Sequence, residues 1–73
     1  MKYPKRIQNR VSRIEGQIGG IKRMINTEVS EEKVMIQLQA VISSLESLKL
    51  ELLKKQMKDS FIENIKKSLS VSE

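Results

Sequence analysis

The regular spacing of apolar residues constrains the fold of this chain more than any other feature. In the first third, six branched apolar residues recur at alternating intervals of four and three positions: Ile7, Val11, Ile14, Ile18, Ile21 and Ile25. This spacing places them along one side of an α-helix. It predicts a helix over residues 4–26, with Pro4 in the first turn, where the missing N–H costs nothing.

The same spacing returns in the middle of the chain. The repeated residues are Val34, Leu38, Val41, Leu45, Leu48 and Leu52. A second apolar set widens this side: Met35, Ile42, Leu50, Leu53 and Met57. We predict a helix over 31–58, with Ser30 as the N-cap and Glu31 and Glu32 in the first turn, where they complement the helix dipole. One stripe would pack on the first helix and the other on a partner chain.

A third, shorter helix is predicted over residues 60–69. The pattern changes near Asp59, and Ser60 and Glu63 have the spacing of a capping box. The apolar residues of this segment are Phe61, Ile62, Ile65 and Leu69. The sequence therefore predicts an all-α fold with a single domain over residues 1–73.

Chain length and composition point to an oligomer. A domain of 73 residues buries only about 60% of its unfolded surface and is marginal as a monomer. The chain has no cysteine for a disulfide and no histidine, the commonest metal ligand. Association into a dimer or tetramer is the remaining source of stability.

The same absences argue against an enzyme. Without Cys or His, no ordinary nucleophile–base pair can be assembled, and no Gly-rich phosphate loop is present. We expect no cofactor. No apolar run reaches the roughly 20 residues of a membrane span, and no signal-peptide core begins the sequence. We therefore expect a cytoplasmic protein that makes no membrane contact.

Positive charge is concentrated at one end of the chain. The net charge is +5, yet residues 1–23 contain seven Lys and Arg side chains and one acidic side chain. On a helix at roughly 100° per residue, four of them form a ridge beside the apolar stripe: Lys2, Arg6, Arg10 and Arg13. With Lys5 and Arg23, these residues are candidates for contacts to DNA phosphates, although an ordinary solvated face is the alternative. Two aromatic residues are too few for stacking on single strands, so duplex DNA is the favoured partner.

One stretch of the sequence resembles a known family. The residues RVSRIEGQI at 10–18 and GIKRMI at 20–25 are similar to the signature of the CsoR/RcnR family of bacterial metal-, formaldehyde- and sulfur-responsive repressors. The resemblance covers roughly residues 5–69. It implies a three-helix protomer, an antiparallel dimer that forms a four-helix bundle, and a dimer of dimers. It also implies operator binding by a homotetramer through basic residues of the first helix.

The sequence departs from the family at the sensory positions. Members that bind Cu(I) have a Cys, a His and a Cys where this chain has Glu31, Gln56 and Ser60. Because Cu(I) prefers thiolate and imidazole ligands, we predict that Cu(I) is not bound at these positions, and we assign no metal ligand. Gly19 and Ile42 stand where basic residues are frequent in the family, which affects the DNA contacts that the resemblance implies.

Two functions remain open. The first is a DNA-binding transcriptional repressor of this type with an altered or lost sensory site. The second is a helical scaffold or interaction module, including a partner for a sensing paralogue, that no longer binds DNA. Glu31 has two interpretations as well: it could bind a hard cation with Ser60 or Asp59 across a dimer, or simply favour a helix N-terminus.

Overall fold

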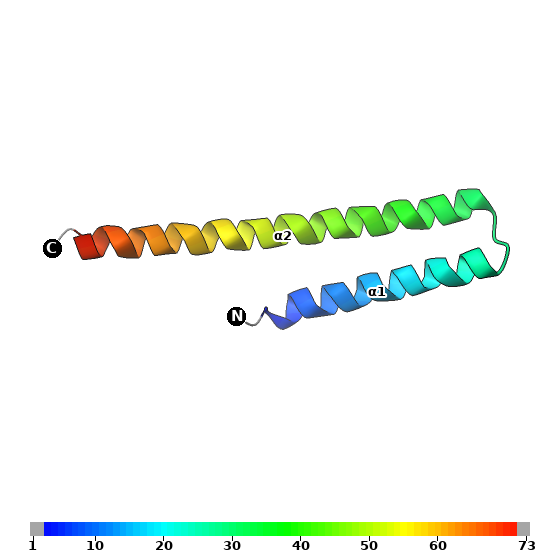
Figure 1. Ribbon diagram of the computed structural model, residues 1–73, viewed down its shortest axis with the longest axis horizontal. Coiled ribbons are helices and arrows are strands. Elements are labelled where there is room, and N and C mark those ends of the chain that lie inside the picture. The colour runs from blue at the N-terminus through cyan, green and yellow to red at the C-terminus, as the bar shows by residue number, and fades with distance from the viewer. Residues whose placement is uncertain (1–2, 72–73) are drawn as a thin grey trace.

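The chain folds as a hairpin of two antiparallel helices (Figure 1). The computed structural model describes residues 3–71. Helix α1 spans Lys5–Asn26 and helix α2 spans Glu31–Val71, and no strand occurs within the described range. The predicted all-α fold class is confirmed.

Backbone contacts define both ends of α1. Pro4 is the N-cap, and its carbonyl accepts hydrogen bonds from the N–H groups of Ile7 and Gln8 at 3.0 and 3.3 Å. At the other end the N–H of Val29 donates to the carbonyl of Met24 at 3.4 Å, as in a Schellman motif. The residue that completes this turn is Glu28, with φ of 57°. Glycine is usual at such a position because the left-handed conformation crowds a Cβ atom.

Helix α2 is continuous where the sequence analysis predicted two helices, so the predicted division into 31–58 and 60–69 is wrong. It begins after Ser30, whose carbonyl accepts a hydrogen bond from Val34 at 3.2 Å, and it passes through Asp59 and Ser60 without a break. Residues 31–71 contain no Gly or Pro, the two residues that most strongly oppose a helix interior. The Asp59 carboxylate also forms an ion pair with the ammonium group of Lys55, one turn earlier, at 2.8 Å. This pair stabilises the helix at the predicted break.

The core of the hairpin is a single row of branched side chains between the two helices. Ile7, Ile14 and Ile21 of α1 are buried, as is Val41 of α2. Val34 and Leu48 pack against this row and are partly buried. These residues belong to the two stripes that the spacing identified, so the prediction that one stripe of the second helix packs on the first is consistent with the structure.

The hairpin is far from compact. Its extents are 68 × 20 × 12 Å and its radius of gyration is 19.1 Å, whereas a compact chain of this length has a radius near 11 Å. The accessible surface is 6489 Å², roughly 1,900 Å² more than the ~4,600 Å² expected of a folded monomer of this mass. Part of the excess arises because the C-terminal portion of α2 extends beyond the start of α1 (Figure 1). None of the described helices is long and apolar enough to span a bilayer.

Many large apolar side chains lie exposed on one side of the hairpin. On α1 each of them comes four residues, about one helical turn, after one of the three buried isoleucines. On α2 they form a second stripe beside the one that contacts α1. At roughly 100° per residue, both sets project to the same side of the plane through the two helix axes. We call this side the apolar face; its residues are Val11, Ile18, Ile25, Leu38, Ile42, Leu45 and Leu53. A free monomer does not ordinarily expose an apolar patch of this extent.

Candidate nucleic-acid interface

The arginines of α1 project to the side of the hairpin opposite the apolar face. Arg6, Arg10 and Arg13 follow one another at intervals of four and three residues, so they lie along one edge of the helix. Ile7 and Ile14 in the core hold this edge in place, because their burial fixes the rotation of α1 about its axis. Arg10 and Arg13 line a shallow groove with Gln17 at the α1–α2 boundary.

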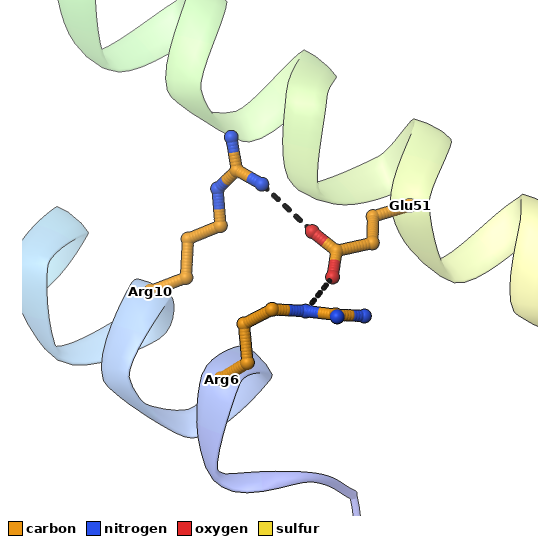
Figure 2. Close-up of polar contacts among 3 residues, drawn as sticks. All are labelled: Arg6, Arg10 and Glu51. Atoms are coloured by element: carbon orange, nitrogen blue, oxygen red, sulfur yellow. Dashed lines mark hydrogen bonds and ion pairs between the residues drawn. The ribbon is translucent and has the colours of Figure 1, made fainter.

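Two of these arginines share a carboxylate of α2 (Figure 2). Arg6 donates from Nε to Oε2 of Glu51 at 2.6 Å, and Arg10 donates from Nη1 to Oε1 at 2.7 Å. The Arg6 side chain is 74% exposed, whereas those of Arg10 and Glu51 are 35% and 21% exposed. The cluster contains two positive charges and one negative charge, so it retains a net positive charge.

The two guanidinium groups determine the ionisation of Glu51. Burial by itself raises the pKa of this carboxyl group, but the hydrogen bonds from Arg6 and Arg10 and their positive charges lower it by more. The net result is a pKa below the ordinary value of 4.5. Glu51 is therefore ionised at neutral pH.

The other basic residues chosen from the sequence are in different positions. The exposed Arg13 makes no side-chain hydrogen bond or ion pair within residues 3–71. Lys5 and Arg23 are exposed and project, by helical spacing, from the side of α1 that faces away from α2. Lys2 lies outside the described residues. The structure therefore places Arg6, Arg10 and Arg13 together and separates Lys5 and Arg23 from them.

The sequence analysis missed the contribution of α2 to this surface. Lys54, Lys55 and Lys58 line a groove of about 330 Å³ that also contains Arg6 and Glu51. Their one-turn spacing on the helix was visible in the sequence, but nothing there showed that this turn lies against the start of α1. We call the combined surface the basic face; its residues are Arg6, Arg10, Arg13, Lys54 and Lys58.

The two departures from the family's basic positions have separate locations. Ile42 lies on the apolar face, 46% exposed, and therefore does not interrupt the basic face. Gly19 is in α1 beside Arg23, where an added Cβ atom would meet the Arg23 guanidinium at 3.7 Å.

The positions that match the family's sensory ligands are far apart within one chain. Glu31 begins α2, and Gln56 lies 25 residues later, or roughly 37 Å along the helix axis at 1.5 Å per residue. Gln56 and Ser60 line one open groove, which also contains Leu53 and Lys49. By helical spacing all three positions share the side of α2 that carries Ile42 and Leu45.

The donor atoms at these positions do not fit the family's metals. One carboxylate, one amide and one hydroxyl offer no soft ligand for Cu(I) and too little charge for a tetrahedral Zn²⁺ site. Throughout residues 3–71, no three acidic, Cys or His side chains are grouped closely enough to hold a metal ion.

Comparison with known proteins gives a family assignment. Neither a curated protein nor a solved structure matches the chain. The family model described as "Metal-sensitive transcriptional repressor" matches residues 3–73, which is nearly the whole chain. The match includes the RVSRIEGQI stretch on which the resemblance was based, both helices and all of the basic face, and this chain therefore belongs to the metal-sensitive transcriptional repressor family.

Proposed function

We propose that this protein is a repressor that binds duplex DNA through the basic face and forms an oligomer through the apolar face. One observation carries the proposal: the basic face and the apolar face, as defined above, lie on opposite sides of the same hairpin. A partner protomer on the apolar face leaves Arg6, Arg13 and Lys58 accessible to the phosphate backbone. Arginine suits that role because its planar group can donate two hydrogen bonds to one phosphate.

The proposed dimer is antiparallel and forms a four-helix bundle. If α2 of one protomer pairs with α2 of the other about an axis near Ser43 and Ser44, Glu31 of one chain comes opposite Gln56 of the second. This pairing also covers Ile42 and Leu45, which lie close to the axis. It removes much of the apolar surface that the protomer exposes in excess of a compact fold. We further propose that two dimers associate, with the basic faces outward.

The sensory site is altered in this proposal. The antiparallel pairing brings Glu31 toward Gln56 and Ser60 of the second protomer, yet this set still lacks thiolate and imidazole groups. A soft metal therefore does not control DNA binding here. Glu31 favours the start of α2 through its charge at the positive end of the helix dipole.

Duplex binding and its salt dependence test the proposal. Affinity for a mixed-sequence duplex would be measured at 50 and 200 mM salt, with the same single strand as the comparison. We expect preferential duplex binding that weakens steeply with salt, by about 0.9 in logarithmic slope for each phosphate neutralised. A folded oligomer that binds no duplex even at low salt would rule out the repressor. The scaffold would then be the remaining interpretation.

Paired variants locate the contact surface in the same assay. Replacing Lys54 and Lys58 together with Ala should weaken binding and flatten the slope. Replacing Lys66 and Lys67, two lysines of α2 in the portion that extends beyond the start of α1, is the matched control (Figure 1). Equal losses in both double variants would show that general charge, and not the basic face, determines binding.

A further inference from the structure

Glu51 is the one acidic side chain bonded to the basic face within residues 3–71, and it contacts two of the arginines that we assign to DNA. We propose that Glu51 is an internal counter-ion that withholds Arg6 and Arg10 from phosphates and so determines how many cations the basic face offers to DNA. This inference rests on the proposed function. It assigns to an acidic residue of α2 a role in the affinity of a surface built mainly from α1.

The donor atoms explain why the contact competes with phosphate. A guanidinium group binds a phosphate in a bidentate manner through a pair of adjacent N–H groups. Arg10 gives Glu51 its terminal Nη1, so its terminal pair is not available. Arg6 gives Nε, and in Figure 2 its terminal nitrogens extend past the carboxylate. Each arginine therefore loses one of its two bidentate edges to Glu51: Arg6 loses the edge that contains Nε, and Arg10 loses the edge formed by Nη1 and Nη2.

Exposure gives the order in which the arginines become available. Arg13 has no partner within the described part of the chain and is available at once. Arg6, at 74% exposure, can exchange the carboxylate for a phosphate easily, because ion pairs in water are weak. Arg10, at 35% exposure and held against α2, exchanges last. The Glu51 charge also repels any phosphate that approaches this cluster.

The test compares Glu51→Gln with Glu46→Gln. Both variants remove one negative charge from α2, but Glu46 is exposed and makes no contact with Arg6 or Arg10. We expect Glu51→Gln to bind duplex DNA at least about threefold more tightly than Glu46→Gln at 50 mM salt. Each released arginine adds about 0.9 to the salt slope, which is roughly a 3.5-fold steeper loss of affinity between 50 and 200 mM.

A second variant separates withholding from positioning. If Glu51 withholds Arg10, Arg10→Ala weakens DNA binding more in the Glu51→Gln background than in the native protein. If Glu51 instead holds Arg10 in a position to bind phosphate, Arg10→Ala weakens DNA binding less in the Glu51→Gln background than in the native protein. That result overturns the proposal. Circular dichroism and sedimentation of each variant show whether the helices and the oligomer persist.

The results also distinguish this inference from the proposed function. Native protein that binds duplex DNA, with Glu51→Gln equal to or weaker than Glu46→Gln, overturns the role of Glu51 and leaves the repressor. Failure of the native protein and of both variants to bind duplex DNA overturns the repressor and this inference together. Native protein that binds weakly and Glu51→Gln that binds tightly support both.

Discussion

Arg10 and Glu51 are 41 positions apart in the sequence, and their side chains meet at 2.7 Å across the two helices. Because Arg6 reaches the same carboxylate, the first two turns of α1 are tied to one point on α2. The contact therefore lies near the start of α1, at the end of the hairpin away from the turn that joins the two helices (Figure 1).

The contact should make stability depend on pH in a defined range. The pKa of Glu51 is below 4.5 in the folded protein. A lowered pKa stabilises the folded state above the unfolded value and loses this effect as the pH falls through the folded value. We expect the native protein to be more stable than Glu51→Gln at pH 7. The difference should be constant down to about pH 5 and should shrink below 4.5.

Urea unfolding of both proteins at several pH values, at one protein concentration, measures this difference. The concentration must be fixed because the stability of an oligomer depends on it. A difference that does not change between pH 7 and pH 3 would mean that the Glu51 charge contributes nothing to the fold.

Glycine at position 28, in the turn between the helices, should stabilise the folded protein. Glu28 has a φ of 57°, a conformation that costs a residue with a Cβ atom roughly 1–2 kcal/mol. We expect Glu28→Gly to stabilise the protein by about 1 kcal/mol, or roughly 4–8 °C in melting temperature. Glu28→Ala is the control, because it removes the charge but keeps the Cβ atom. Equal stabilisation by Ala and Gly would show that the charge, and not the backbone, is unfavourable.

The spacing of apolar residues predicted the helices better than it predicted where they end. The helix expected over 4–26 is α1 at Lys5–Asn26, since Pro4 and the turn at Glu28 give clear local signals. The expected break at Asp59 does not exist. A capping-box pattern such as Ser60 and Glu63 only satisfies N–H groups that a helix end leaves free. It does not end a helix whose preceding turns are favourable and contain no Gly or Pro.

The basic face was predictable in part for a similar reason. Residues on one helix have relative positions that follow from 3.6 residues per turn, so the alignment of Arg6, Arg10 and Arg13 could be read from the sequence. The pairing of Arg10 with Glu51 depends on how α1 and α2 align lengthwise. No periodicity within a single helix contains that information, and the lysines of α2 were missed for this reason.

A charge on the apolar face should dissociate the oligomer. In the proposed dimer, Ile42 lies near the two-fold axis, so Ile42→Lys places two lysines close together in an apolar contact. We expect this variant to sediment as a smaller species than the native protein at micromolar concentration. Ile36→Lys is the matched control. Ile36 is the same residue type on the same helix and is more exposed, at 60% compared with 46%, but it lies away from the apolar face.

Retention of the native oligomer in Ile42→Lys would contradict the proposed pairing. Dissociation of both variants would show that added charge anywhere on α2 is sufficient, and the apolar face would lose its assignment. A native protein that is itself a stable, folded monomer of 8.4 kDa would exclude the bundle altogether.

Arg13 gives the cleanest test of the DNA surface, because it is exposed and has no side-chain partner within residues 3–71. Its removal therefore breaks no contact of the protomer, in contrast to removal of Arg10. We expect Arg13→Ala to weaken duplex binding and to reduce the salt slope by about 0.9 for each protomer in contact with DNA. Lys22→Ala is the control, since Lys22 is an exposed cation on the opposite side of the same helix. Helicity and oligomeric state should be unchanged in both variants.

If Arg13→Ala dissociates the oligomer, Arg13 pairs with an acidic residue of another protomer and is structural. If both variants leave DNA affinity and its salt dependence unchanged, the basic face does not contact phosphates, and the repressor proposal loses its main support.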